Sequence, residues 1–449
     1  MTTTLIANAR VIDPSQGLDA ARHVLVDGGV IKALPPTTQT PVADRVIDAR
    51  GCVVAPGFID LHVHLREPGG EASETIRTGT RAAALGGFTT VFCMPNTNPV
   101  CDNPITVKYI LDRAADAGPT RVAPVAAVTT GQQGELLTDF AALREAGAGA
   151  LSDDGRPVIA SELMRRAMEH AASLGIVILD HCEDMSLTGE GVMHEGPTAL
   201  RLGLRGIPRA SEAACVARDC LLSLLTGCRL HICHVSNIES VEAIRHFKKR
   251  GAPVTAEVSP HHLTMTEVAV AGVAGGGGVT GRGAYDTHAK MKPPLCEESD
   301  RLALIEALED GTLDCIATDH APHSPASKAT TFEVAPFGII GMETAFPVLC
   351  DAFVKTGRWT LPFLVDKLAC APARLMGDTP QTKGRGTLAP GAPADVVMLR
   401  EGEAWRFDEA RLGSKSRNCP WLGSTFHAGV VGTMADGKWS LEPPATMRA

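Results

Sequence analysis

The chain has 449 residues, with 42 Lys and Arg against 51 Asp and Glu, so its formal net charge is −9. Apolar residues make up 44% of the sequence and aromatic residues 4%. Such a chain can bury a large core, which excludes wholesale disorder. An acidic chain with few aromatic residues is also a poor binder of nucleic acid or of membrane surfaces. The length suits one large α/β domain with a smaller domain attached.

The 13 cysteines are an odd number. No two of them form a C-x-x-C pair, and several lie in apolar runs, as Cys93 and Cys233 do. This usage is typical of reduced, buried thiols in a cytoplasmic protein. The N-terminal segment reaches Arg10 and Asp13 before any long apolar stretch, so we expect no signal peptide. No run of about 18 apolar residues occurs, so we expect no transmembrane helix.

Both ends of the chain are predicted to form short strands separated by turns. Asp27-Gly28-Gly29 lies between two apolar runs and predicts a hairpin, and Asp436-Gly437 indicates a second turn. We therefore expect residues 1–55 and 386–449 to form one small β domain, and residues 56–385 to form the main domain. The strands predicted in the small domain are 23–26, 30–32, 46–48, 52–55, 394–399 and 429–433.

The middle of the chain alternates short apolar strands with amphipathic helices, which predicts an α/β fold of the (β/α)8 TIM-barrel type. An open doubly wound sheet has a similar periodicity, but no G-x-G-x-x-G motif follows a strand. Residues 268–283, which include four successive glycines, are expected to form a surface insertion. The predicted strands are 58–64, 89–94, 121–128, 149–152, 176–181, 229–234, 253–258 and 314–319. The predicted helices are 72–84, 104–117, 135–146, 160–174, 211–226, 238–250 and 299–309.

Histidines and carboxylates collect at the ends of these strands, where barrel enzymes build their active sites. His62 and His64 lie two residues apart on the first strand and therefore point to the same face. Taken alone, the pair is equally compatible with a polar layer and with a metal site. Four further strand ends carry the Ser152-Asp153-Asp154-Gly155 run, His181, His234 and Asp319.

Four imidazoles and two carboxylates at five strand ends suit one or two divalent cations, most simply zinc. A Ser-Asp-Asp-Gly run is usually a turn or a helix cap, and a single strand-end histidine is usually a core residue, but the combination favours a metal site. A water activated by such a site needs no Ser or Cys nucleophile. Asp319 could take its proton and deliver it to a leaving nitrogen. These residues therefore predict metal-assisted hydrolysis of an amide-like bond.

The motifs resemble those of the cyclic amidohydrolases of the amidohydrolase superfamily, and within them the bacterial type I (class I) dihydroorotases. The resemblance starts at residues 56–69 (PGFIDLHVHLREPG) and continues through residues 94–97, 152–155 and 180–184. It covers nearly the whole chain, the terminal β segments included. The other matching stretches are 202–208, 233–236, 259–263, 317–323 and 336–339.

The resemblance implies reversible conversion of (S)-dihydroorotate to N-carbamoyl-L-aspartate, the third step of pyrimidine synthesis. It also implies that zinc, one or two ions per subunit, is held by the strand-end residues, with Asp154 rather than Asp153 as the bridging carboxylate. One ion would lie on His62, His64 and Asp319, and the second on His181 and His234. The residues implied to bind the substrate are Arg66, Asn96, His323, Phe337 and Gly338.

One motif departs from the family pattern. The family commonly has Asn before Pro-Pro-Leu-Arg, whereas this chain has Lys292 at the Asn position and Cys296 at the Arg position. Lys292 therefore either contacts the substrate in place of the Asn or points to solvent.

Two alternatives remain. Hydantoinases and allantoinases share the fold but typically bridge their metals with a carboxylated lysine, and residues 147–156 contain no lysine. A non-catalytic scaffold for aspartate carbamoyltransferase would lose metal ligands, and this chain keeps all six. The resemblance further implies a small-molecule substrate, a homodimer and a possible complex with that transferase, in the cytoplasm.

Overall fold

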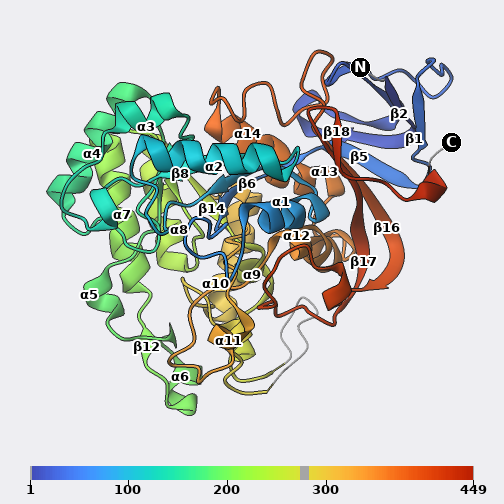
Figure 1. The fold of residues 1–449 in the computed structure, drawn as a ribbon. Helices are drawn as coiled ribbons and strands as arrows, with labels where there is room; N and C mark the ends of the chain where they lie inside the picture. The colour runs from blue at the N-terminus through green and yellow to red at the C-terminus, as the bar shows by residue number, and fades with distance from the viewer. Residues whose placement is uncertain (1–2, 274–282, 448–449) are drawn as a thin grey trace.

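The structure is a computed structural model that describes residues 3–273 and 283–447. Its centre is a parallel eight-stranded sheet with the order β15-β14-β13-β10-β9-β8-β7-β6. Helices surround this sheet, as Figure 1 shows. The strands are β6 (Phe58–Val63), β7 (Phe88–Cys93), β8 (Arg121–Ala126), β9 (Ala150–Leu151), β10 (Ile178–Asp180), β13 (Leu230–Ile232), β14 (Val254–Val258) and β15 (Cys315–Ile316).

The last strand of the sheet returns to the first. Val63 pairs with His320 in a parallel bridge, and the Asp60 carboxylate accepts hydrogen bonds from the backbone N–H (3.0 Å) and the hydroxyl (2.6 Å) of Thr318. The predicted barrel fold is therefore confirmed. Strand 314–319 was predicted too long, because Thr318 bonds to Asp60 and Asp319 has a left-handed backbone with φ of 47°.

The helices largely follow the predicted order but differ at their ends. The helix predicted from 72 begins at Ile76, because Thr75 caps it by accepting from the N–H of Thr78. The helix predicted from 135 begins at Phe140, because the Asp139 side chain caps it. The helices are α1 (Ile76–Leu85), α2 (Pro104–Ala117), α3 (Phe140–Ala146), α4 (Ser161–Leu174), α7 (Ala210–Thr226), α8 (Ile238–Lys249) and α10 (Glu298–Glu309).

The α-helices that follow α11 (Pro325–Lys328), near the end of the barrel domain, were not predicted. They are α12 (Met342–Leu349), α13 (Leu361–Val365) and α14 (Ala371–Met376). Each contains a proline, Pro347 inside α12 and Pro362 and Pro372 in the first turns of the other two. Proline is tolerated in a first turn and is otherwise a helix breaker, so these segments look irregular in the sequence.

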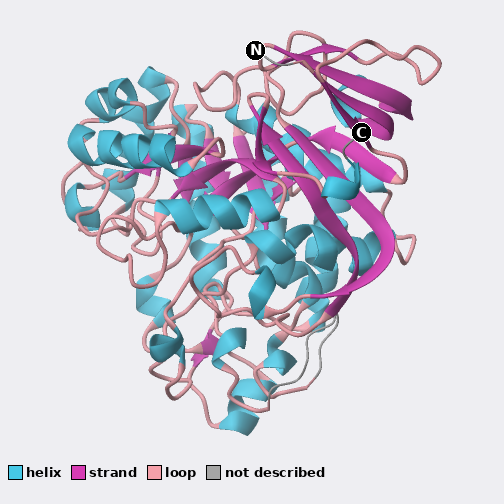
Figure 2. Cartoon of the chain, turned by 45° about the vertical axis from the view of Figure 1, so that its right-hand side comes forward, coloured by secondary structure: helices cyan, strands magenta, loops and turns pink. Residues whose placement is uncertain are grey.

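The two ends of the chain form a second sheet beside the barrel, as predicted. Its strand order is β18-β17-β16-β5-β1-β2-β3, with β4 paired to β1, and both termini lie on this side of the molecule (Figures 1 and 2). The predicted hairpin at 27–29 joins β2 to β3. The strands are β1 (Thr4–Asp13), β2 (Leu18–Asp27), β3 (Val30–Ala33), β4 (Arg45–Asp48), β5 (Cys52–Pro56), β16 (Val396–Arg406), β17 (Thr425–Ala435) and β18 (Lys438–Leu441).

Shorter elements extend from the barrel at the bottom of Figure 1, where α6 and β12 lie. Most of the predicted insertion at 268–283 lies outside the described residues. In the described part of the chain, no helix has the length and apolar character that crossing a membrane requires. The short elements of the main domain, of which α9 lies near the centre of Figure 1, are α5 (Met185–Thr188), β11 (Met193–His194), α6 (Pro197–Leu202), β12 (Gly206–Ile207), α9 (Pro260–Thr264) and α11 (Pro325–Lys328).

Candidate active site

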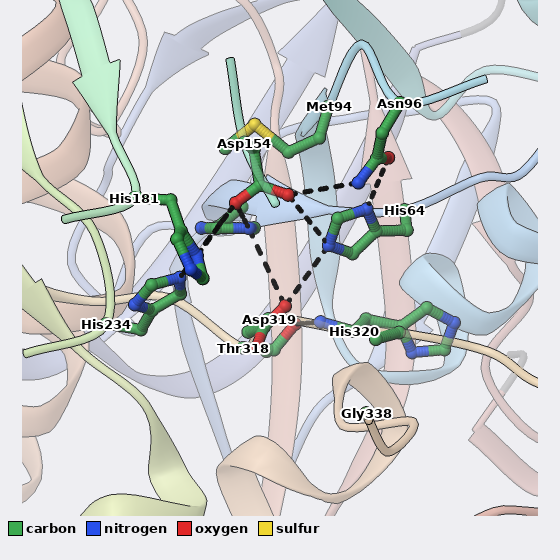
Figure 3. Close-up of polar contacts among 12 residues, drawn as sticks. His64, Met94, Asn96, Asp154, His181, His234, Thr318, Asp319, His320 and Gly338 are labelled. Carbon is green, nitrogen blue, oxygen red and sulfur yellow. Dashed lines mark hydrogen bonds and ion pairs between the residues drawn. The ribbon is translucent and has the colours of Figure 1, made fainter. Parts of the chain in front are cut away.

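The strand-end histidines and aspartates meet at one buried point of the barrel, with the Asp154 carboxylate between His64 on one side and His181 and His234 on the other (Figure 3). His62 and His64 both come from the end of β6, and the other four side chains each lie within three residues of the end of β9, β10, β13 or β15, so the barrel itself brings them together. The six residues are His62, His64, Asp154, His181, His234 and Asp319, and all are at most 6% exposed.

His62, His64 and Asp319 form one half of the cluster. Asp319 Oδ1 lies 3.3 Å from His64 Nε2 and 3.6 Å from His62 Nε2. These three residues present their ligand atoms within 4.8 Å of one another. Two imidazole nitrogens and one carboxylate oxygen at such spacing form a donor set for a cation such as zinc.

His181 and His234 form the other half, and Asp154 connects the two. His181 Nδ1 lies 2.9 Å from His234 Nε2 and 3.4 Å from Asp154 Oδ1. The same Asp154 oxygen lies 3.3 Å from His62 Nε2, and Asp154 Oδ2 lies 3.6 Å from His64 Nε2. A carboxylate placed between two donor sets is the arrangement that a bridging ligand requires.

The unpartnered atoms of the cluster fit a cation. His62 Nε2 and Asp154 Oδ1 are fully buried and have no hydrogen-bond partner among the described residues. Buried polar atoms are nearly always satisfied, so this pair indicates a group that protein atoms do not supply. Burial alone would raise the pKa values of Asp154 and Asp319, but the surrounding histidines, His62 and His181 beside Asp154 and His64 beside Asp319, hold both well below the usual range. Both carboxylates are therefore anionic at neutral pH.

The Nδ1 atoms of His62 and His64 contact polar side chains outside the cluster. His62 Nδ1 lies 3.2 Å from Glu257 Oε1, and His64 Nδ1 lies 2.9 Å from Asn96 Oδ1. Glu257 also accepts from His231 Nε2 at 3.0 Å. Such partners fix the tautomer and orientation of a metal-binding imidazole. Glu257 was missed in the sequence, although a single acidic residue inside the apolar strand β14 is a signal for it.

A cavity of about 190 Å³ opens onto the cluster. The sequence-predicted substrate residues Arg66, Asn96, His323, Phe337 and Gly338 all line it, together with Lys292. Gly338 has a φ of +123°, and a Cβ added there would lie 2.6 Å from the Cβ of Ala321, so only glycine fits. Asn96 also bonds to the cluster itself, because its Nδ2 donates to Asp154 Oδ2 at 3.1 Å.

Arg66 supplies an unpaired positive charge to this cavity. Its Nε donates to the carbonyl oxygen of Pro322 at 3.1 Å, and its Nη2 lies 3.5 Å from His323 Nε2. No carboxylate of the described residues lies within ion-pair distance of the guanidinium, and Asp319 and Asp154 act on it only through longer-range electrostatics. Burial, reinforced by the charge of Arg66, lowers the pKa of His323 to about 3, so this histidine is neutral. The cavity therefore has one cationic end suited to an anionic ligand.

Lys292 lies inside the site and does not point to solvent. Its Nζ is 2.9 Å from Glu183 Oε1 and 5.3 Å from the centre of the Phe337 ring. Its side chain is 21% exposed. Glu183 belongs to the motif at residues 180–184, but no sequence pattern indicated its contact with Lys292.

Three residues of the site have a left-handed backbone, namely Arg66 (φ 61°), His234 (φ 34°) and Asp319 (φ 47°). Non-glycine residues rarely adopt this conformation, and it is found preferentially at functional sites. All three positions lie two or three residues beyond the end of a barrel strand.

Solved structures with the same fold are hydrolases of cyclic amides by their names. L-Hydantoinase (dihydropyrimidinase) from Arthrobacter aurescens superposes with a TM-score of 0.86 at 24% identity, over 98% of this chain and 96% of that one. D-Hydantoinase (dihydropyrimidinase) from Thermus sp. gives a TM-score of 0.79 at 24% identity, over 98% and 95%. At this identity the likeness establishes the barrel architecture with its terminal β domain.

Sequence relatives define the family within that fold. A family model described as dihydro-orotase-like matches residues 51–240. The dihydroorotase of Pelobacter propionicus is 46% identical over 97% of this chain and 98% of its own length. The dihydroorotase of Anaeromyxobacter dehalogenans is 48% identical over 96% of both chains. The chain belongs to the dihydroorotase family.

Proposed function

We propose that this protein is a class I dihydroorotase of the amidohydrolase superfamily, which reversibly hydrolyses (S)-dihydroorotate to N-carbamoyl-L-aspartate in pyrimidine synthesis. The observation that carries this proposal is the half-buried Arg66 guanidinium, which faces the cavity beside the histidine cluster without a carboxylate partner among the described residues. Dihydroorotate is a cyclic amide that bears one carboxylate. It offers the anion that Arg66 lacks and the amide bond that the cluster is suited to attack.

The proposed cofactor is zinc, one or two ions per subunit. His62, His64 and Asp319 would hold one ion, His181 and His234 the second, and Asp154 both. The unpartnered His62 Nε2 and Asp154 Oδ1 support this assignment. When bound, zinc supplies a Lewis acid that polarises the amide carbonyl and makes a water molecule acidic enough to attack it.

The protein's own residues would carry the remaining chemistry. Arg66, Asn96 and His323 hold the ring carboxylate, while Phe337 and Gly338 contact the ring. Asp319 accepts a proton from the attacking water and returns it to the ring nitrogen as the carbon–nitrogen bond breaks. Water is consumed, the carbonyl carbon becomes a carboxylate, and the nitrogen leaves as part of a neutral ureido group. One proton of the water goes to that nitrogen and the other is released to solvent. Ring closure uses the same groups in reverse.

Hydantoin or allantoin hydrolysis is the second candidate, and two observations disfavour it. Residues 150–154 are Ala-Leu-Ser-Asp-Asp, so an aspartate stands where those enzymes typically have a carboxylated lysine. The hydantoinase structures are only 24% identical to this chain, against 46–48% for the dihydroorotases. A purely scaffolding role is disfavoured because the donor set is complete.

We further propose a homodimer in the cytoplasm that can form a complex with aspartate carbamoyltransferase while it is active. The family resemblance and the 13 buried free cysteines support this location. Light scattering of the purified protein, alone and mixed with that transferase, tests both assemblies.

The experiment that tests the function compares ring opening of dihydroorotate, dihydrouracil, hydantoin and allantoin by one preparation whose metal content is measured. We expect turnover of dihydroorotate above all others, one or two zinc ions per chain, and loss of activity on chelation with recovery on adding zinc. Turnover of hydantoin or allantoin equal to that of dihydroorotate, or full activity without metal, contradicts the proposal.

A further inference from the structure

Glu183 lies between a histidine of the cluster and a lysine of the cavity. Its Oε2 is 3.2 Å from His181 Nε2, and its Oε1 is 2.9 Å from Lys292 Nζ. The hydroxyl of Thr188 also donates to Oε1, at 2.6 Å. Glu183 is only 5% exposed, so both oxygens of one buried carboxylate are engaged by three fixed partners.

This arrangement determines which nitrogen of His181 is available to a cation. A neutral imidazole carries one ring proton. The hydrogen bond to Glu183 places this proton on Nε2 of His181. The lone pair is then on Nδ1, the atom that lies 2.9 Å from His234 Nε2 and 3.4 Å from Asp154 Oδ1. A carboxylate behind a metal-binding histidine orients the ring and makes it a stronger donor. Glu183 therefore strengthens the His181 and His234 half of the centre.

Lys292 contacts the same carboxylate and has the opposite effect on cation binding. Its ammonium neutralises part of the Glu183 charge and adds a positive charge close to the place of a cation. In the other half, the carboxylate behind His62, Glu257, forms no ion pair with a lysine or arginine of the described residues and is bonded instead to the imidazole of His231. The two halves therefore differ in charge: the carboxylate behind His181 is paired with a lysine, and the carboxylate behind His62 is paired with a histidine.

We propose that Glu183 and Lys292 together set how tightly His181 and His234 hold their cation, with Glu183 strengthening and Lys292 weakening the binding. Glu183 is a positioning residue in this scheme, and Lys292 acts on the cation through it. The inference rests on the two-cation centre of the proposed function. It makes the cation on His181 and His234 the first to leave when free zinc is lowered.

The test measures zinc bound per chain against buffered free zinc, together with the visible spectrum of the Co²⁺-loaded protein. We expect Glu183→Gln to weaken the second cation by about 10–100-fold, the usual effect of removing such a partner. Lys292→Met should tighten binding of the second cation several-fold, because it removes a positive charge while Thr188 and His181 still hold the Glu183 carboxylate in place. Lys292→Arg should behave like the wild type. Lys355→Met, which alters an exposed lysine, is the matched control.

A double variant separates this scheme from a merely structural role. If Lys292 acts through Glu183, adding Lys292→Met to Glu183→Gln should change cation binding less than it does in the wild type. Weaker binding in both single variants, or a Lys292→Met variant in which only the KM for dihydroorotate changes, overturns the proposal. In either case a wild type with two cations leaves the proposed function intact. If the wild type takes up no second cation, the inference about Glu183 and Lys292 is wrong, because it assumes two cations.

Discussion

The carboxylates of Asp153 and Asp154 are neighbours in the chain but bind different partners. Asp153 Oδ1 accepts from the backbone N–H groups of Val128 (2.8 Å) and Thr129 (3.1 Å), and its Oδ2 accepts from the Thr129 hydroxyl. Asp154 instead lies 3.3 Å from His62 and 3.4 Å from His181. One aspartate therefore holds the loop after β8, and the other belongs to the histidine cluster.

We predict that Asp154→Ala impairs cation binding and turnover, whereas Asp153→Ala impairs stability. Asp154→Ala should lose cation binding and nearly all turnover while remaining folded, because it removes a donor from both halves of the centre. Asp153→Ala should lower the unfolding temperature, because it leaves two buried backbone N–H groups without an acceptor. Metal analysis and thermal unfolding of both variants measure this. Equal losses of metal in the two variants would contradict the assignment.

Arg66 is predicted to select substrates that bear a carboxylate on the ring. Arg66→Met should raise the KM for dihydroorotate steeply and leave the metal content unchanged, because the guanidinium touches Pro322 and His323 rather than the donor set. Truncating one partner of a buried charge pair costs roughly 2–5 kcal/mol, which is a factor of about 30 or more in affinity. Steady-state kinetics check this. Wild-type turnover of dihydrouracil at the rate of dihydroorotate would refute it.

Glu343 is predicted to make stability depend on pH. Burial raises its pKa to about 7, although it accepts from the N–H of Gly413 at 2.5 Å. The folded chain thus keeps a proton that the unfolded chain releases above its ordinary pKa, so this stabilisation is complete below about pH 4.5 and is lost as pH rises through 7.

Replacing Glu343 by Gln keeps an acceptor for Gly413 and removes the titration. The free energy of unfolding of the wild type, measured in urea, should fall between pH 5 and pH 8 by up to about 2–3 kcal/mol relative to Glu343→Gln. The exposed Glu145→Gln is the control and should parallel the wild type. Parallel curves for the wild type and Glu343→Gln would show that the carboxyl titrates normally.

The barrel and its cluster could be predicted because they depend on local patterns. Alternating apolar strands and helices repeat along the chain, and residues two apart on a strand, such as His62 and His64, share a face. The partners behind the cluster could not be predicted in this way. Glu257 approaches His62 across the barrel, and Lys292 approaches Glu183 from a loop, so both contacts depend on packing between segments distant in sequence.

Helices α12, α13 and α14 could not be predicted for a different reason. Local signals favour irregular structure where Pro347, Pro362 and Pro372 occur, yet the chain is helical there. Pro362 and Pro372 occupy first-turn positions where no N–H is needed. Pro347 lies inside the fully buried helix α12, where packing outweighs the lost hydrogen bond.

Asp319 is predicted to move the proton as well as to hold a cation. Its Oδ1 lies 3.3 Å from His64 Nε2, and His64 and His62 hold its pKa well below the usual range in spite of burial. It is therefore ionised at neutral pH and ready to accept a proton from water in the hydrolytic direction. Ring closure needs the protonated form, whose small fraction grows as pH falls, so lowering the pH from neutral should speed synthesis while hydrolysis stays nearly constant until the pH approaches the lowered pKa.

The Asp319→Asn variant separates the two roles, because the amide keeps an oxygen for the cation but cannot carry the proton. General acid–base help is worth about 10²–10⁴-fold, so kcat should fall by that factor in both directions. Metal content should stay near that of the wild type, and the rise of the synthesis rate at lower pH should disappear. Near wild-type turnover with intact metal would instead assign the proton transfer to another group of the cavity, of which His323, with its Nε2 2.7 Å from the carbonyl oxygen of Phe337, is the nearest candidate by chemistry.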